Sequence, residues 1–272
     1  MTDTMAALDR ALTAGGDALM ARLGRVEIEH KGPMDLVTDA DRASEAAVLG
    51  VIREAFPDHD ILAEEGGATA GAGGGATGPG DDGWLWIVDP LDGTTNFAHG
   101  FPAFSVSIAL RRGPRQIVAA GVLAPATGER FLAERGAGAT LNGRPLAVSR
   151  VADLSGALAV SGFPYDRALD PDRYLAPWRG FLKKAHGVLR LGSAALDLCH
   201  VAAGRLDVFW EEKLKPWDTA AGWLIAEEAG AMVTDFSGQP FDPFGPELLA
   251  TNGLIHRECM ETLAESRGGT RR

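Results

Sequence analysis

Residues 86–97 carry the groups of this chain that are best suited to chemistry, because an apolar run ends there in two carboxylates, a glycine and two hydroxyls. Asp89 and Asp92 stand on either side of a tight bend, and the Leu91 carbonyl lies between them. Three oxygen atoms can therefore converge on a small volume, which suits a hard cation such as Mg²⁺. A plain strand-to-helix turn capped by an aspartate fits the same residues, so the turn alone leaves both interpretations open.

The elements on either side must position this turn. Residues 84–88 are aromatic and β-branched, as in a buried strand. Pro90 lacks the N–H that a strand ladder needs, so we expect the strand to end at Asp89. A short helix is expected to open at Gly93, and its free N–H groups would face the same place, where an anion could lie. Metal and phosphate would then share one turn.

Three further carboxylates stand at the ends of predicted elements. Each has an ordinary explanation as a helix cap, as a partner of the helix dipole or as a solvated charge. Glu64 is followed by Glu65, and two adjacent glutamates at a strand end repel each other unless a cation neutralises their charge. These carboxylates are Asp41 in the first turn of a helix over 40–55, Glu64 after a strand over 61–63, and Asp218 in the first turn of a helix over 217–230.

The whole chain narrows the class of protein. Its 272 residues are 46% hydrophobic, which fits one large domain or two closely packed lobes. The net charge of −11 argues against a nucleic-acid partner. No run is long enough to span a membrane and no secretory signal is visible, so we expect a cytoplasmic protein. The histidines and cysteines have no metal-ligand spacing, so any metal is expected to be held by oxygen.

The remaining elements follow from periodicity and turn signals. We expect an opening amphipathic helix that ends near Gly24, a strand at Val26 and Ile28, and an antiparallel meander of strands. Residues 66–80 are glycine-rich and are expected to form a mobile flap, and the Pro- and Asp-rich segment up to Trp178 stays unassigned. The meander strands are 104–110, 117–123 and 130–133; later elements are strands at 157–160 and 206–210 and a helix from Ser193 to Ala203. Cys199 and Cys259 are expected to be buried free thiols.

Four segments together resemble one known family. They are residues 86–97, 217–222, 35–41 and 64–66, and they look like the signatures of the inositol monophosphatase family. The similarity extends over nearly the whole chain. It implies an α+β fold, a layered α-β-α-β-α sandwich, in a single catalytic domain over 1–272. It also implies two lobes, a metal and phosphate lobe over 1–150 and a substrate lobe over 151–272, and usually a homodimer that is inhibited by lithium.

The resemblance also implies roles for individual residues, with two or three Mg²⁺ ions in each active site. The activating metal would be held by Glu64, Asp89 and the Leu91 carbonyl, and a second metal by Asp89, Asp92 and Asp218. The catalytic residues would be Asp41, Thr94 and Glu64, with the pair Asp41 and Thr94 orienting the attacking water. The Gly93 and Thr94 amides would bind phosphate, and the substrate residues would be Asp92, Gly192, Ser193, Ala194, Glu211 and Asp218. Lys31 lies one residue closer to Asp35 than the family's usual lysine, so its role stays open.

The implied activity is Mg²⁺-dependent hydrolysis of inositol 1-phosphate, or of a related small polyol or sugar phosphate, to the alcohol and inorganic phosphate. Relatives of this fold also act on fructose-1,6-bisphosphate, histidinol phosphate and 3′-phosphoadenosine nucleotides, and these substrates stay open. A different class of function is an inactive regulatory binding protein. The expected partner is a small phosphomonoester, with no nucleic acid and no membrane.

Overall fold

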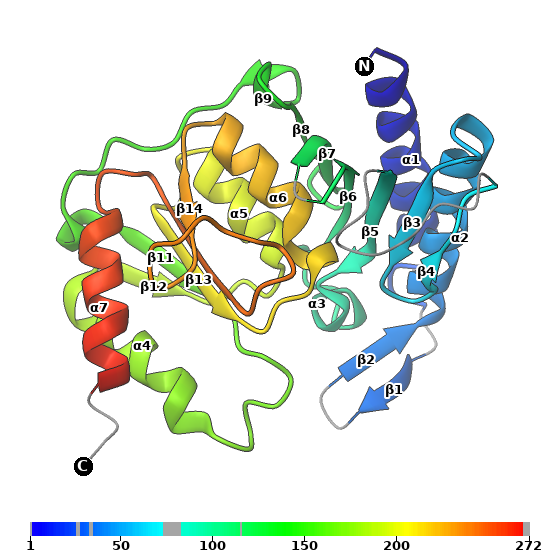
Figure 1. Ribbon diagram of the computed structural model, residues 1–272. Coiled ribbons are helices and arrows are strands. Elements are labelled where there is room, and N and C mark those ends of the chain that lie inside the picture. Colours follow the sequence, from blue (N-terminus) through cyan, green and yellow to red (C-terminus); the bar gives the residue numbers. More distant parts are fainter. Residues whose placement is uncertain (1, 26–27, 33–34, 73–82, 115, 269–272) are drawn as a thin grey trace.

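The computed structural model describes residues 2–25, 28–32, 35–72, 83–114 and 116–268 (Figure 1). The helices of these residues are α1 (Thr2–Met20), α2 (Asp39–Ala55), α3 (Thr94–Ala98), α4 (Pro171–Lys184), α5 (Ala194–Ala202), α6 (Pro216–Glu228) and α7 (His256–Gly268), with a 3-10 turn at Leu154–Gly156. The strands are β1 (Ile28–Gly32), β2 (Asp35–Thr38), β3 (Asp60–Ala63), β4 (Gly67–Thr69), β5 (Trp84–Asp92), β6 (Ser105–Arg112), β7 (Gln116–Ala124), β8 (Glu129–Glu134), β9 (Gly138–Leu141), β10 (Arg144–Pro145), β11 (Leu158–Ser161), β12 (Gly187–Leu189), β13 (Val208–Glu212), β14 (Met232–Thr234) and β15 (Glu247–Thr251).

The strands form two large sheets and one hairpin. The eight-stranded sheet has the order β10, β9, β8, β7, β6, β5, β3, β4, and β1 pairs only with β2 among the described strands. Its pairs are antiparallel except for β3 with β5, so the predicted meander of β6, β7 and β8 is confirmed. The five-stranded sheet has the order β12, β11, β13, β15, β14, with β11 parallel to both of its neighbours.

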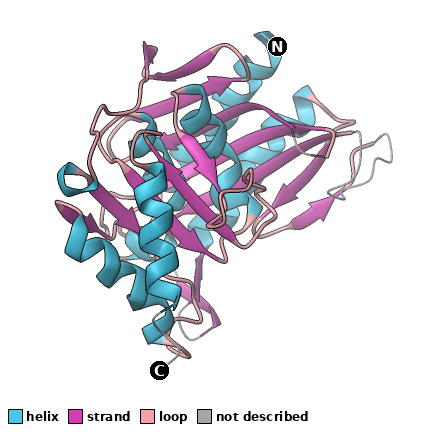
Figure 2. Ribbon diagram, turned by 60° about the vertical axis from the view of Figure 1, so that its left-hand side comes forward, coloured by secondary structure: helices cyan, strands magenta, loops and turns pink. Residues whose placement is uncertain are grey.

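Helices cover both faces of each sheet, in five layers (Figure 1). Helices α1 and α2 cover one face of the eight-stranded sheet, and α5 and α6 lie between the two sheets. Figure 2, in which the side of α4 and α7 comes forward, shows these two helices on the outer face of the five-stranded sheet. The predicted α-β-α-β-α sandwich is therefore confirmed.

The apolar runs of the sequence fit this layering. Along β5, Trp86 and Val88 pack into the core under α1 and α2, while Leu85 and Ile87 pack into the core that contains α5 and α6. Successive side chains of a strand point to opposite faces, so a strand covered on both faces must be apolar throughout. This explains why the segment before the central turn is continuously hydrophobic rather than alternating.

The central strand differs from its prediction. β5 does not end at Asp89 but continues to Asp92. Asp89 pairs with Ser107 and Asp92 pairs with Ser105, so two residues of β5 oppose one of β6. This is a β-bulge, and Pro90 is tolerated in it because a bulged residue makes no ladder hydrogen bond. Asp89 and Asp92 are therefore both residues of β5 and not of a loop after it.

Other differences lie in the weakly patterned segments. The segment left unassigned contains α4, which begins at Pro171 and is capped by the Asp170 side chain. The first part of the predicted flap forms β4, which pairs with β3, while residues 73–82 lie outside the described residues, as do Val26 and residue 27 of the predicted first strand. Cys199 and Cys259 are buried free thiols, as predicted.

The structure also bears on membrane-spanning segments and on the division into two lobes. None of the described helices is both long and apolar enough to cross a membrane. The division into lobes 1–150 and 151–272 stays a prediction. The two sheets follow it, since one lies within residues 60–145 and the other within 158–251, but α6 from the second half packs against β7 in the first.

Candidate active site

The bulge in β5 fixes the directions of its two carboxylates. The backbone N–H of Leu91 donates to Asp89 Oδ1 at 3.0 Å, which turns that carboxylate back over the bulge. Ser44 Oγ of α2 donates to the Pro90 carbonyl at 2.7 Å, which ties the bulge to the helix behind it. Asp89 is almost completely buried and Asp92 nearly so. The turn is therefore built into the protein core and cannot move as a surface loop would.

The predicted short helix after Gly93 is present as α3. Gly93 has φ 92°, a left-handed conformation, and a Cβ atom there would lie 2.8 Å from the Ala103 carbonyl oxygen. Only glycine fits this position. Asn96 of α3 donates from Nδ2 to the carbonyls of Ala103 at 2.7 Å and Leu191 at 2.8 Å. This amide connects the central turn to the distant segment that precedes Gly192.

Asp41 caps α2 and also contacts Thr94. Its Oδ2 accepts hydrogen bonds from the N–H of Thr38 at 2.8 Å and from the Thr38 hydroxyl at 2.6 Å, in a capping box at the start of α2. Its Oδ1 accepts from Thr94 Oγ1 at 3.2 Å, and the same hydroxyl lies 3.1 Å from the Leu91 carbonyl oxygen. Burial raises the pKa of Asp41, while the Thr38 hydrogen bonds act in the opposite direction. The structure thus brings Asp41 and Thr94 together.

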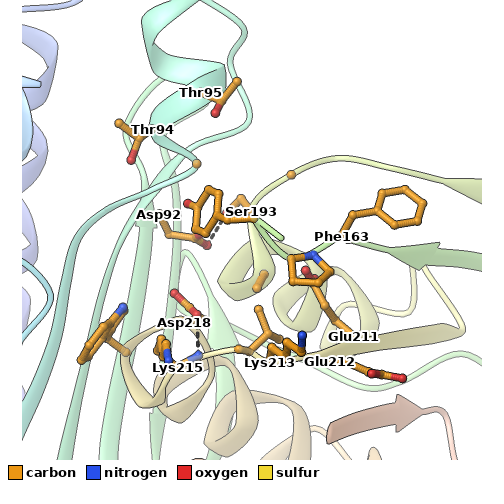
Figure 3. Close-up of a pocket in the computed structure, with 18 of the residues that line it drawn as sticks. Asp92, Thr94, Thr95, Phe163, Ser193, Glu211, Glu212, Lys213, Lys215 and Asp218 are labelled. Atoms are coloured by element: carbon orange, nitrogen blue, oxygen red, sulfur yellow. Dashed lines mark hydrogen bonds between the residues drawn. The ribbon is translucent and has the colours of Figure 1, made fainter. Parts of the chain in front are cut away.

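Asp92 and Asp218 approach the same space from two elements (Figure 3). Asp92 Oδ2 accepts from Ser193 Oγ at 2.6 Å and from the N–H of Ala195 at 2.8 Å, at the start of α5. Asp218 Oδ2 accepts from the N–H of Lys215 at 2.7 Å, in the first turn of α6. Burial raises the pKa of Asp92 to about 6, with the Ser193 hydrogen bond opposing it. Both residues lie where the sequence placed them, at element ends that meet.

These carboxylates repel one another. Burial raises the pKa of Asp89 well above its usual value, and the negative charges of Glu64, Asp92 and Asp218 raise it further. The pKa of Asp218 is also raised, by burial first and then by Asp92. Among the described residues, no three His, Cys, Asp or Glu side chains lie so that they could hold a metal ion as they stand. The raised pKa values of Asp89 and Asp218 show a mutual repulsion that a bound cation would relieve.

A cavity of about 490 Å³ opens beside the carboxylates. Asp41, Asp89 and Leu91 are not among its lining residues, whereas the other predicted site residues line it: Glu64, Asp92, Gly93, Thr94, Gly192, Ser193, Ala194, Glu211 and Asp218. These residues come from widely separated parts of the chain. Most of the predicted metal, phosphate and substrate residues therefore face one cavity.

Glu211 lies deeper in the structure than its sequence position indicated. It does not leave a strand but is part of β13, as is Glu212, and each is only 8% exposed. Because both side chains are buried, neither Glu211 nor Glu212 is a solvated surface charge. Glu212 is bound by Arg173 and Arg267, at 2.5 Å each. Burial raises the pKa of Glu211 to about 8, against the lowering effect of Arg190.

Comparison with known proteins identifies the family. A family model described as "Inositol monophosphatase family" matches residues 2–269. The chain is 46% identical to the "Nus factor SuhB" of Pseudomonas aeruginosa over 84% of each chain, and 44% identical to the "Inositol-1-monophosphatase" of Synechocystis sp. over 93% of this chain and 86% of that one. The solved structure of the inositol monophosphatase from Anabaena matches with a TM-score of 0.85 at 41% identity, over 96% of this chain and 95% of the other. The chain belongs to the inositol monophosphatase family.

Proteins of the inositol monophosphatase family generally depend on Mg²⁺. The donors present here fit that ion, because carboxylates and one backbone carbonyl are the hard oxygen ligands that Mg²⁺ prefers. The residues that would hold it are Glu64, Asp89, Leu91, Asp92 and Asp218. They come from the residue after β3, from β5 and from the first turn of α6, and a bound cation would relieve the repulsion among their carboxylates.

Several cavity residues had no role in the sequence interpretation. Arg190, Lys213 and Lys215 add positively charged side chains to the lining of the cavity, and Phe163 and Tyr165 add aromatic surface. No spacing pattern marks them, because each comes from a connector between elements. A partial signal exists at Lys213, which has φ 65°, since a non-glycine residue in the left-handed region indicates a constrained position.

Proposed function

We propose that this chain is a Mg²⁺-dependent phosphoric monoester hydrolase that acts on inositol 1-phosphate or on a related small polyol or sugar phosphate. The observation that carries the proposal is the single cavity in which a repelling carboxylate set, the start of α3 and the buried Glu211 all meet. The carboxylates suit cations, the helix start suits the phosphate, and Glu211 suits the hydroxyls of a polyol.

The phosphate would lie against the Gly93 and Thr94 amides. The first N–H groups of a helix have no acceptor within the helix, so they can donate to the phosphate oxygens. Two or three Mg²⁺ ions, held by Glu64, Asp89, Leu91, Asp92 and Asp218, would neutralise the phosphate charge and make water a better nucleophile. The amides would position the phosphate and the metal ions would neutralise its charge. Phosphoryl transfer depends mainly on these two effects.

Thr94 and Asp41 would orient the attacking water. The Thr94 hydroxyl donates to Asp41 Oδ1, so its oxygen is left to accept a hydrogen bond from water. That water would then be held in line with the ester bond, with Asp41 fixing the direction of the hydroxyl. A bond would form from the water oxygen to phosphorus as the ester P–O bond breaks. The attacking water would give up one proton to the solvent and the leaving oxygen would take one from it, so that the alcohol and hydrogen phosphate result.

The substrate alcohol would occupy the other side of the cavity, between the 192–194 segment and Glu211 (Figure 3). A carboxylate there can accept hydrogen bonds from neighbouring hydroxyls of a polyol. A buried carboxylate left without those hydroxyls is unfavourable, so a polyol phosphate is preferred over a featureless ester. A cytoplasmic homodimer and inhibition by lithium complete the proposal.

The test is phosphate release from a panel of esters, with Mg²⁺ and with excess chelator. The panel contains inositol 1-phosphate, fructose-1,6-bisphosphate, histidinol phosphate, a 3′-phosphoadenosine nucleotide and glycerol 2-phosphate. Inositol 1-phosphate should give the highest kcat/KM, and chelator should abolish release. A higher value for another member would move the assignment to that substrate class.

The second candidate is a regulatory binding protein without catalysis. The relative named "Nus factor SuhB" favours including it, because it carries the name of a factor and not of a phosphatase. The same panel separates the two functions. If the wild-type protein with Mg²⁺ releases phosphate from none of the esters, the regulatory candidate is left and the hydrolase is excluded.

A further inference from the structure

Gly162 lies beside the Glu211 carboxylate at the ends of two parallel strands. β11 pairs with β13 so that Ser161 is opposite Trp210, and the next residue of each strand is Gly162 and Glu211. Ser161 Oγ donates to the Trp210 carbonyl at 2.7 Å, which holds the two strand ends together. Both Gly162 and Glu211 line the cavity. The Gly162 backbone therefore lies directly against the Glu211 side chain.

The Glu211 carboxylate occupies the space that a side chain at 162 would need. A Cβ atom on Gly162 would lie 2.2 Å from Glu211 Oε2, 2.3 Å from Oε1 and 2.4 Å from Cδ. These distances are far shorter than any van der Waals contact. Gly162 does not have a left-handed φ, so its backbone could carry any residue. Glycine is required at this position for space and not for conformation.

The backbone at 162 cannot retreat to make room. Phe163 packs on Trp178 of α4 with ring centroids 5.4 Å apart, and Trp178 lies 6.3 Å from the ring of Trp210. Phe181 of α4 also stacks on Trp210, with ring centroids 4.0 Å apart. This aromatic row holds the segment after Gly162 against the same strand that carries Glu211. An added methyl group would therefore displace the carboxylate, which is the end of a flexible side chain, and leave the fold intact.

We propose that Gly162 is a specificity-determining position, because the absence of a side chain there lets the Glu211 carboxylate lie where a substrate hydroxyl can reach it. The inference rests on the proposed function, in which Glu211 binds the polyol. A side chain at 162 turns the carboxylate away, so recognition of the polyol is lost. Hydrolysis of a featureless ester is kept, because the carboxylates and Thr94 on the other side of the cavity are untouched.

The test compares inositol 1-phosphate with p-nitrophenyl phosphate in four proteins: wild type, Gly162→Ala, Glu211→Ala and the double variant. Gly162→Ala should lower kcat/KM for inositol 1-phosphate about tenfold, mainly through KM, the effect expected from one lost hydrogen bond. The value for p-nitrophenyl phosphate should change less than about twofold. The double variant should be no worse than Glu211→Ala, because the effect of Gly162 passes through Glu211. Gly50→Ala, at an exposed helix position with open space, is the control.

Three results would overturn the inference: an equal loss on both esters, a further loss when Gly162→Ala is added to Glu211→Ala, or a crystal structure of Gly162→Ala with the carboxylate in its original place. The second result would mean that the methyl group blocks the substrate directly. If the wild-type protein hydrolyses neither ester, the proposed function fails instead. The crystal structure of the variant then still decides whether Gly162 positions Glu211.

Discussion

The two sides of the cavity are built in different ways. The phosphate side, made of residues 89–94 with Asp41, Glu64 and Asp218, rests on one β-bulge and on the starts of helices. The polyol side, made of residues 162–165, 190–194 and 211–215, is assembled from three separate connectors and strand ends. The first is held by hydrogen bonds from backbone N–H groups to its carboxylates, and the second by aromatic packing and ion pairs. The proposed function assigns the chemistry to the first side and the recognition of the substrate alcohol to the second.

The two sides of the cavity also differ in how their negative charges are balanced. On the phosphate side, Asp89 and Asp218 have raised pKa values because the carboxylates are buried and oppose one another. On the polyol side, Arg190 lies near enough to lower the pKa of Glu211 and so compensates part of its charge. We therefore expect the phosphate side to need added cations, whereas the charge of Glu211 on the polyol side is partly balanced by Arg190. The following predictions test this contrast, beginning with the largest effect.

Removal of Mg²⁺ should abolish turnover and lower the stability of the protein. Ions that bind only the folded chain stabilise it by mass action, about 2.7 kcal/mol at 100 times Kd, so saturating Mg²⁺ should raise Tm by about 5 °C or more. Thermal unfolding with Mg²⁺ and with chelator measures the shift. Full activity in excess chelator would show that the phosphate side does not need cations, and the contrast would be lost.

Asp218→Asn should lower kcat on the order of 1000-fold, because several kcal/mol of charge stabilisation is removed with the ligand. Stability without metal should stay equal or rise, since one of the repelling carboxylates becomes neutral. Asp172→Asn is the matched control, because Asp172 is also in the first turn of a helix but is exposed on α4. Similar kinetics for the two variants would mean that Asp218 only compensates the dipole of α6.

The fold was readable from the sequence where periodicity was strong. The apolar run before Asp89, the meander and the helix capped by Ser193 were all predicted. The end of β5 was not, because proline stops a regular strand but not a bulged one, and the bulge depends on the partner strand β6. Helix α4 was missed because its two prolines and its acidic start obscure a pattern that tertiary packing completes.

In the candidate site too, some parts could be predicted from the sequence and others could not. The phosphate side could be predicted because its groups are contiguous or stand at element ends, where each residue type has a chemical reason to be. Arg190 and Phe163 could not be predicted, because their places depend on how distant connectors meet. The function of Gly162 is visible only in the distances to Glu211, since the sequence gives no sign that these two residues are neighbours.

Thr94→Ala should lower kcat about 100-fold, the usual range for a group that positions or transfers a proton, while Mg²⁺ still raises Tm as in the wild type. The hydroxyl bridges Asp41 and the Leu91 carbonyl, so Thr94→Ser should keep most of the activity. Parallel kinetics and Mg²⁺-dependent melting curves separate catalysis from metal binding. Equal loss in the Ala and Ser variants would leave Asp41 as a helix cap alone.

The smallest effect concerns stability on the polyol side. The pKa of Glu211 is about 8 in the folded protein and near 4.5 when the chain unfolds, so the folded state holds this proton more tightly. Stability is therefore unaffected by Glu211 below about pH 4.5, falls as pH rises towards 8, and stays reduced above it. Without metal, Glu211→Gln should match the wild type at pH 4.5 and melt a few degrees higher at pH 9. The exposed Glu54→Gln controls for net charge, and a gain of equal size in both variants, or at both pH values, would show that Glu211 carries no buried charge.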